Sequence, residues 1–177
     1  MVKEGSRNIS NIVLVGMPGV GKSTIGVILA KSLGMGFVDT DILIQQKEKR
    51  TLQEIIDASG YLTLRRIEEK VLLQLQCCRD VIATGGSAVY SSKAMDHLGA
   101  TGMIVFLHLD FAALQRRVRD FHVRGIARRP DQNFYDLFCE RSELYTQYAD
   151  ITVDCRNRTK EEICERISRE FGTLTKS

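Results

Sequence analysis

Nine residues near the start of the chain, GMPGVGKST from Gly16 to Thr24, match the pattern G-x-x-x-x-G-K-[ST] and leave the neighbouring segments few ways to fold. The β-branched run Ile12 to Val15 precedes them and is typical of a buried strand, and Lys22 to Leu33 is predicted to follow as a helix. Glycines let the backbone turn so that successive N–H groups point at phosphate oxygens, and the helix N-terminus adds free donors. The segment therefore predicts a phosphate-binding loop.

Two side chains of this loop suit a nucleoside triphosphate. Lys22 would bring a positive charge to the β- and γ-phosphates, and the Ser23 hydroxyl would be a ligand for Mg²⁺. We expect the nucleotide to contact Gly16, Gly19, Val20, Gly21, Lys22, Ser23 and Thr24. A plain glycine-rich turn is the alternative, which the flanking strand and helix disfavour.

Short apolar runs alternate with helical patterns along the rest of the chain. Strands are predicted at 12–15, 37–38, 81–83, 103–107 and 151–153. Helices are predicted at 22–33, after the Thr51–Glu54 capping box, at 62–78, from Asp110 to about Val118, at 134–148 and after the Thr159–Glu162 capping box. Strands that alternate with helices indicate an α/β fold with a mainly parallel sheet covered on both faces.

Length and composition limit the classes of protein. The 177 residues fit one domain, and the net charge of +3 is too small and too scattered to indicate nucleic-acid binding. Met1 to Asn8 is polar, and no apolar run approaches the roughly 20 residues that span a bilayer. The five cysteines are odd in number and lack C-x-x-C spacing, so we expect free thiols in a reducing cytoplasm and no zinc site.

The class of nucleotide-binding protein can be narrowed by motifs that are missing. A GTPase would carry an N-K-x-D motif, and the sequence has none. A motor-type ATPase would end an apolar strand in an acid, but the predicted strand at 81–83 runs into Thr84-Gly85-Gly86. These features favour a kinase that acts on a small molecule.

The longest irregular segment, Arg119 to Gln132, is polar and arginine-rich and contains Gly125 and Pro130. Loops of this size in a compact domain are often functional lids, so we expect a basic lid that is too polar to join the core. A surface loop without a function is the alternative.

Several polar residues are candidates for an acceptor site. Asp39 and Asp41 end a predicted strand and point to opposite sides, so one could face a metal and the other an acceptor. Gly85 leaves backbone N–H groups open to a ligand. Arg65 and Glu68 lie three apart on one predicted helix, so the acid could orient the guanidinium. Turn and cap aspartates, a tight turn and a solvated ion pair are the alternatives.

Taken together, the motifs resemble those of the shikimate kinase family from about Asn11 to Phe171. The matching segments are GMPGVGKST at 16–24, FVDTD at 37–41, GYLTLRRIE at 60–68, IATGGSAV at 82–89, RRP at 128–130 and RSELYTQYAD at 141–150. The resemblance implies a three-layer P-loop kinase fold with a five-stranded parallel sheet flanked by helices. It also implies a substrate-binding region at about 40–70 and a lid at about 119–132.

The same resemblance implies roles for individual residues. Asp41 matches the acid that contacts the acceptor hydroxyls, and Asp39 matches the acid near Mg²⁺. Shikimate would be bound by Asp41, Arg65, Gly85, Gly86 and Arg141, with the two arginines holding its carboxylate. Arg117 matches an arginine packed near adenine, and Arg129 matches the lid arginine, with Arg128 as the alternative.

The implied reaction is transfer of the ATP γ-phosphoryl group to the 3-hydroxyl of shikimate, which gives shikimate 3-phosphate and ADP. Lys22, Asp41 and Arg129 would be the catalytic residues, and ATP and Mg²⁺ would be required. We expect a cytoplasmic monomer that binds these small molecules and neither nucleic acid nor membrane. Another P-loop kinase, for example of the gluconate type, and a nucleotide-binding regulatory module without catalysis are the alternatives.

The sequence departs from the family pattern beside the acceptor site. Gln45 and Tyr61 stand where acids are usual, and Ser87 replaces the third glycine of a Gly-Gly-Gly turn. If that position required a positive φ, the serine would cost roughly 1–2 kcal/mol. In the lid, Asp131 and Gln132 follow Pro130 where the family has two leucines.

Overall fold

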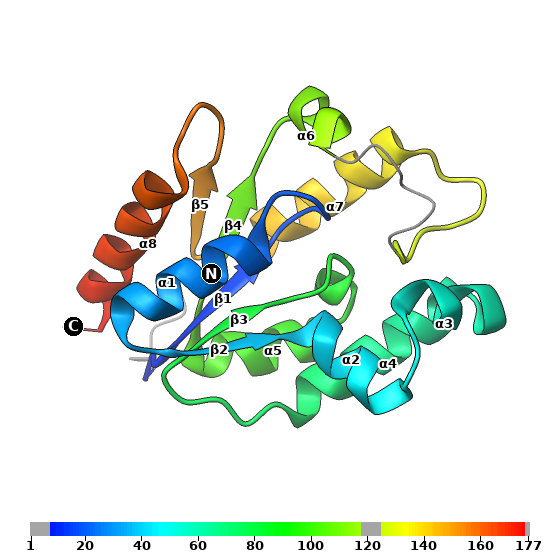
Figure 1. Cartoon of the computed structure of the whole chain (residues 1–177), viewed down its shortest axis with the longest axis horizontal. Helices are drawn as coiled ribbons and strands as arrows, with labels where there is room; N and C mark the ends of the chain where they lie inside the picture. The colour runs from blue at the N-terminus through cyan, green and yellow to red at the C-terminus, as the bar shows by residue number, and fades with distance from the viewer. Residues whose placement is uncertain (1–7, 118–124, 176–177) are drawn as a thin grey trace.

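A five-stranded parallel sheet with strand order β2-β3-β1-β4-β5 forms the centre of the computed structural model, which describes residues 8–117 and 125–175 (Figure 1). The strands are β1 (Asn11–Val15), β2 (Gly36–Asp39), β3 (Asp80–Ala83), β4 (Gly102–His108) and β5 (Ile151–Asp154). Every neighbouring pair is parallel. The predicted α/β class and the five-stranded parallel sheet are confirmed.

Helices cover both faces of the sheet and make three layers (Figure 1). On one face α1 packs against α8, while α5 and α7 contact β4 on the other and α4 packs against α5. The helices are α1 (Lys22–Leu33), α2 (Thr40–Glu48), α3 (Leu52–Ser59), α4 (Tyr61–Gln74), α5 (Ser92–Thr101), α6 (Phe111–Arg117), α7 (Phe134–Tyr148) and α8 (Lys160–Leu174), with a 3-10 turn η1 (Ala88–Tyr90). Among the described residues, no helix has both the length and the apolarity needed to cross a bilayer.

Helix caps predicted from the sequence are formed. Thr51 accepts a hydrogen bond from the Glu54 amide, and the Glu54 carboxylate accepts one from the Thr51 amide at 2.7 Å. The same reciprocal pair closes the N-terminus of α8 at Thr159 and Glu162. Asp110 accepts from the Ala113 amide at 2.8 Å and begins α6. These caps satisfy backbone donors that have no partner inside the helix.

The end of α4 differs from the prediction of a helix to Cys78. The helix ends at Gln74, and Leu75 takes an extended conformation with φ −65° and ψ 127°. The Cys78 amide donates to the Asp80 carboxylate at 3.0 Å, so the next residues turn into β3 rather than continue the helix. Leu75 and Cys78 continue the helical spacing of apolar residues by chance, although the helix has already ended.

Residues that are distant in sequence form two hydrophobic clusters. The larger surrounds the sheet, and the smaller consists of Ile44, Ile55, Leu64, Val71 and Ala127 beneath α2, α3 and α4. The smaller cluster supports the region predicted at about 40–70 to bind substrate.

The expected lid is partly in the core, so the prediction that its polarity keeps it out is wrong for residues 125–127. Ile126 and Ala127 are buried, with exposed fractions of 8% and 3%. The Gly125 amide donates to Gln53 at 3.0 Å, and its φ of 61° lets the chain turn inward there. Residues 119–124 of the lid, which include Arg119 and Arg124, lie outside the described residues, as does Val118 at the predicted end of the preceding helix.

Strand register gathers the functional motifs at one edge of the sheet. Val15 at the end of β1 leads into the phosphate loop, and Asp39 at the end of β2 lies beside Ala83 of β3. In a parallel sheet, ligands bind outside the carboxyl ends of the strands. The phosphate loop, Asp39 and the turn after Ala83 therefore share one crevice.

Candidate active site

The phosphate loop opens on a cavity of about 800 Å³. Gly21 is the N-cap of α1 and has no side chain to bond the first amides of the helix. The described residues that line the cavity include Pro18, Gly19, Gly21, Lys22, Ser23, Thr24 and Asp41. Free amides at a helix N-terminus attract anions, so this cavity suits the phosphates of a nucleotide.

Lys22 lies over its own loop. Its ammonium group donates to the carbonyl oxygens of Gly16 at 2.7 Å and of Met17 at 3.2 Å. Burial lowers the pKa of Lys22 to about 8, while the nearby Asp41 carboxylate opposes this shift. An anion in the cavity would favour the charged form, because opposite charges stabilise each other.

Ser23 and Asp39 come together as predicted for a metal-binding pair. The Ser23 hydroxyl donates to Asp39 Oδ2 at 2.6 Å, and Asp39 Oδ1 accepts from the amides of Asp41 and Ile42 at 3.0 and 3.4 Å. Within 8–117 and 125–175, no three His, Cys, Asp or Glu residues gather to bind a metal by themselves. A hydroxyl beside a carboxylate nevertheless fits Mg²⁺, which usually binds few protein oxygens together with phosphate and water.

Asp41 lies between the nucleotide cavity and a smaller cavity of about 60 Å³. Burial raises its pKa, and the charge of Lys22 opposes the change. The smaller cavity is lined by Pro18, Lys22, Asp41, Ile44, Leu52, Leu64, Glu68, Gly85, Gly86, Ser87, Gly125, Ile126, Ala127 and Arg141. The predicted acceptor residues Asp41, Gly85, Gly86 and Arg141 therefore share one cavity next to the phosphate loop.

The glycine turn after β3 is fixed from two sides. The Gly85 amide donates to the Thr40 hydroxyl at 3.0 Å, so the expectation that this amide is open to a ligand is wrong. The Gly86 carbonyl accepts from the Tyr145 hydroxyl at 2.6 Å. A Cβ at Gly85 would collide with the carboxylates of Glu68 and Asp41. Glycine is therefore required at this position by close approach of acidic side chains.

Ser87 takes ordinary backbone geometry and a specific partner. Its φ is −102°, so the strain that a positive φ would have caused does not arise. Its hydroxyl donates to Glu68 Oε2, and the other Glu68 oxygen is buried without a hydrogen-bond partner among the described residues. Burial, together with the nearby charge of Asp41, raises the pKa of Glu68 to about 7.

This contact changes the role expected for Glu68. The spacing indicated that Glu68 could orient Arg65, with a solvated pair as the alternative. The Glu68 carboxylate instead points to Ser87, and no ion pair joins it to Arg65 in the described structure. The helix places the two side chains within reach, but the serine hydroxyl is the partner that the Glu68 carboxylate bonds.

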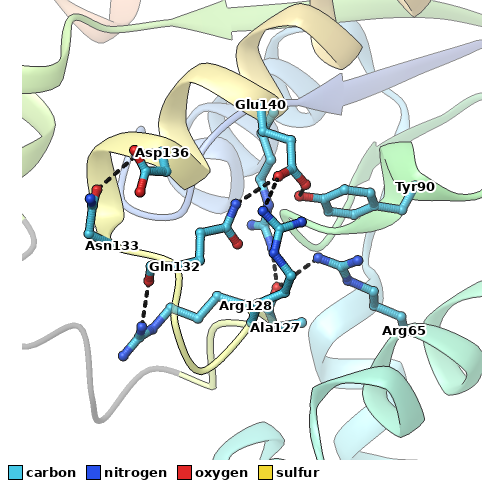
Figure 2. A network of polar contacts seen from close by, with 10 residues as sticks. Arg65, Tyr90, Ala127, Arg128, Gln132, Asn133, Asp136 and Glu140 are labelled. Carbon is cyan, nitrogen blue, oxygen red and sulfur yellow. Dashed lines mark hydrogen bonds and ion pairs between the residues drawn. The ribbon is translucent and has the colours of Figure 1, made fainter.

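Arg65 and Arg141 converge on one oxygen atom, as Figure 2 shows for Arg65 and Ala127. The Ala127 carbonyl accepts from Arg141 at 2.7 Å and from Arg65 at 3.3 Å. Arg141 is 1% exposed. Burial lowers the pKa of Arg65; the Tyr90 ring opposes this shift, and the Arg141 charge adds to it. Two guanidinium groups aimed at one oxygen make a site for a carboxylate.

A polar network next to this pair links α7, η1 and the end of the lid (Figure 2). The Tyr90 hydroxyl donates to Glu140 at 2.5 Å, and the other Glu140 oxygen accepts from Gln132 at 2.7 Å. Arg129 forms an ion pair with Glu140 at 3.1 Å, and the guanidinium of Arg128 donates to the Gln132 carbonyl at 2.7 Å. The network holds residues 128–132 against α7.

Neither candidate lid arginine lies in the nucleotide cavity. The Arg129 side chain is 48% exposed in its ion pair with Glu140, and Arg128 bonds the backbone of its own turn. The structure thus places both beside the acceptor site and away from the phosphate loop.

Arg117 lies where a nucleotide base could be reached from the phosphate loop. Its guanidinium donates to the Val20 carbonyl at 3.2 Å. It also borders a cavity of about 550 Å³ that is shared with Val20, Gly21 and Thr24 of the loop and with Arg158. Its role near adenine stays a prediction.

Three members of the site were not predicted from the sequence. Tyr90 and Glu140 orient their neighbours, and Ala127 contributes a backbone carbonyl, which no sequence pattern encodes. Tyr90 follows the glycine turn, and Glu140 directly precedes Arg141, so nearness to candidate residues was the only available signal.

Comparison with known proteins gives one consistent result. A family model described as shikimate kinase matches residues 18–171. A shikimate kinase of Mycobacterium avium (strain 104) is 41% identical over 149 residues, which cover 82% of this chain and 84% of the relative. One from Rippkaea orientalis (strain PCC 8801 / RF-1) is 37% identical over 170 residues, or 94% and 90% of the two chains.

A solved structure agrees with these relatives. It is described as shikimate kinase from Acinetobacter baumannii in complex with shikimate, and it matches with a TM-score of 0.85 and 28% identity. The match covers 94% of this chain and 95% of that one.

Proposed function

The chain belongs to the shikimate kinase family and phosphorylates shikimate with ATP, and we propose from the site geometry how its own residues bind and align the two substrates. The observation that carries the proposal is the convergence of Arg65 and Arg141 on one oxygen beside Asp41 and the phosphate loop.

The acceptor is held at two ends. Arg65 and Arg141 bind the carboxylate of shikimate in place of the Ala127 carbonyl, which shows that an oxygen fits between them. Asp41 accepts a hydrogen bond from the 3-hydroxyl, and Gly85 and Gly86 line the ring. Guanidinium forks suit a carboxylate, and a carboxylate suits neighbouring hydroxyls, so the acceptor has one orientation.

ATP is held by the loop amides and by Lys22, with Arg117 near the base. The hydroxyl oxygen of shikimate forms a bond to the γ-phosphorus while the bond to the β,γ-bridging oxygen breaks, and that electron pair leaves with ADP. Asp41 positions the hydroxyl and takes its proton. Because phosphoryl transfer has a loose transition state, positioning contributes more than the strength of the base.

Ser23 and Asp39 are the residues that would hold Mg²⁺. When bound, Mg²⁺ would neutralise charge on the phosphate oxygens. Asp39 would keep its hydrogen bonds from the Asp41 and Ile42 amides, so its position and that of Asp41 stay coupled.

Arg129 is proposed to stabilise the transferring phosphoryl group after it leaves Glu140. The Arg129 side chain is about half exposed in this ion pair, and such pairs stabilise a protein by only about 0–1 kcal/mol. Arg129 can therefore leave Glu140 for a phosphate at little cost in free energy. Arg128 is the alternative residue for this role.

We further propose a single-domain monomer that works in the cytoplasm without nucleic acid or membrane. All proposed site residues come from one chain and meet at one sheet edge. All five cysteines are free thiols, which suits a reducing compartment.

The test is ADP release with a panel of acceptors. We expect Mg²⁺-dependent ADP formation with shikimate and little more than background with gluconate or without an acceptor. Nuclear magnetic resonance of the product should locate the phosphate on the 3-hydroxyl. Equal ADP release with and without shikimate would reject the proposed arrangement.

A further inference from the structure

The Arg65 guanidinium lies over the face of an aromatic ring. Its central carbon is 3.5 Å from the centroid of the Tyr90 ring, and Figure 2 shows both side chains. The same carbon is 5.1 Å from the centroid of the Tyr61 ring. Tyr61 is one turn before Arg65 on α4, whereas Tyr90 comes from η1 after the glycine turn. The cation therefore has one close aromatic contact from another element and a second, weaker one from its own helix.

The hydrogen-bond donors of Arg65 are almost unused. Among the described residues its one hydrogen bond goes to the Ala127 carbonyl, and its buried Nε has no partner there. Glu68, three residues further along the same helix, bonds Ser87. Within 8–117 and 125–175, no carboxylate forms an ion pair with Arg65.

From these contacts we propose that Tyr90 is a positioning residue for the acceptor site, whose ring supports the Arg65 guanidinium face and leaves its N–H edge free for the acceptor carboxylate. This inference rests on the proposed role of Arg65. A carboxylate partner would occupy the donors and cancel the charge that the acceptor needs. A ring face attracts the cation without using any N–H donor.

Tyr90 is itself held in place, which is necessary if it is to position another group. Its hydroxyl donates to Glu140 at 2.5 Å, and Glu140 is tied to Gln132 and Arg129. Burial raises the pKa of Tyr90, and the bond to Glu140 raises it further, so the ring stays a neutral phenol. The Tyr90 ring therefore stays uncharged and keeps its orientation across the working pH range.

The test compares Tyr90→Leu with Tyr90→Phe in steady-state kinetics of the full chain. Leucine removes the ring face, so we expect the KM for shikimate to rise about tenfold, while kcat and the KM for ATP stay within about twofold. Phenylalanine keeps the ring and loses only the hydroxyl, with its bond to Glu140 and its contact with Arg141, so its KM should stay within about threefold of wild type. Tyr135→Leu, on the exposed side of α7, is the matched control and should change nothing.

A double variant shows whether Tyr90 acts through Arg65. Arg65→Ala should raise the KM for shikimate strongly, and adding Tyr90→Leu to it should raise it no further. The inference would be overturned, and the Arg65 role left intact, if the two substitutions raised the KM for shikimate additively. It would also be overturned if Tyr90→Leu changed kcat or the KM for ATP as much as the KM for shikimate. No change in Arg65→Ala would overturn both. If Tyr90→Leu does not fold, Tyr90→Met serves for the same comparison.

Discussion

At the scale of single residues, the acceptor pocket brings together buried charges of both signs. Lys22, Asp41, Glu68 and Arg141 all border the smaller cavity. Burial disfavours the charged form of each ionisable group, whereas an opposite neighbour favours it. The result is a lysine with a lowered pKa and two acids with raised pKa values in one small volume.

Glu68 should make stability depend on pH. Its pKa is about 7 in the folded protein and about 4.5 ordinarily, so between these values the folded state holds a proton that the unfolded chain has lost. The free energy of unfolding therefore falls as pH rises from about 4.5 to 7, by roughly 3 kcal/mol from this group, and is flat above. Glu68→Gln, which cannot titrate, should remove this slope in denaturant unfolding measured at several pH values.

The comparison isolates Glu68 from its neighbours. Asp41 also has a raised pKa, but it is present in both proteins, and the titration of Lys22 begins near pH 8, above this window. If wild type and Glu68→Gln show parallel stability curves from pH 4.5 to 7, the carboxyl does not hold a proton in the folded state.

At the scale of elements, the start of the described lid is joined to α3. Ile126 and Ala127 are buried, and Gly125 passes so close to Leu52 that a Cβ would lie 2.5 Å from the Leu52 Cβ and 2.9 Å from the Gln53 nitrogen. The described part of the lid is therefore anchored to α3 at residues 125–127.

Gly125→Ala should destabilise the protein through both strain and collision. Gly34 provides a matched control, because its φ of 62° nearly equals the 61° of Gly125 and nothing lies within 4 Å of its added Cβ. Gly34→Ala should cost about 1–2 kcal/mol from the backbone alone, and Gly125→Ala should cost at least about 1 kcal/mol more. Equal losses of unfolding free energy would mean that residue 125 is not packed against α3.

Arg129 tests the proposed movement of the lid. Arg129→Ala should lower kcat by about 100-fold and leave the Kd for ATP nearly unchanged, because the contact forms mainly in the transition state. Arg128→Ala should be milder. If Arg128→Ala loses turnover and Arg129→Ala keeps it, Arg128 is the lid arginine that acts in catalysis. If both variants keep normal kcat, neither residue takes part in catalysis.

These elements also show what the sequence could and could not predict. The sheet, the phosphate loop and the capping boxes depend on neighbouring residues, and all were predicted. The end of α4, the burial of Ile126 and the stacking of Tyr90 on Arg65 depend on contacts between distant segments, which local patterns do not record. The Arg65–Glu68 pairing was wrong because Ser87, far along the chain, bonds Glu68.

At the scale of the whole molecule, the two hydrophobic clusters support different parts of the site. The sheet cluster fixes the phosphate loop, and the smaller cluster beneath α2, α3 and α4 supports the acceptor pocket. Arg141 from α7 reaches between them and is almost fully buried. In the proposed arrangement each substrate is held by its own packed region, and the two regions meet at Asp41 and Lys22.

Calorimetric titration of shikimate and of ATP into wild type and Arg65→Ala tests this arrangement most directly. Loss of one guanidinium from the carboxylate site should weaken shikimate binding by about thirtyfold or more, because a desolvated charge pair contributes on the order of 2–5 kcal/mol. ATP affinity should stay within about twofold, since Arg65 lies outside the nucleotide cavity. Unchanged shikimate affinity, or equal weakening of both ligands, would contradict the account.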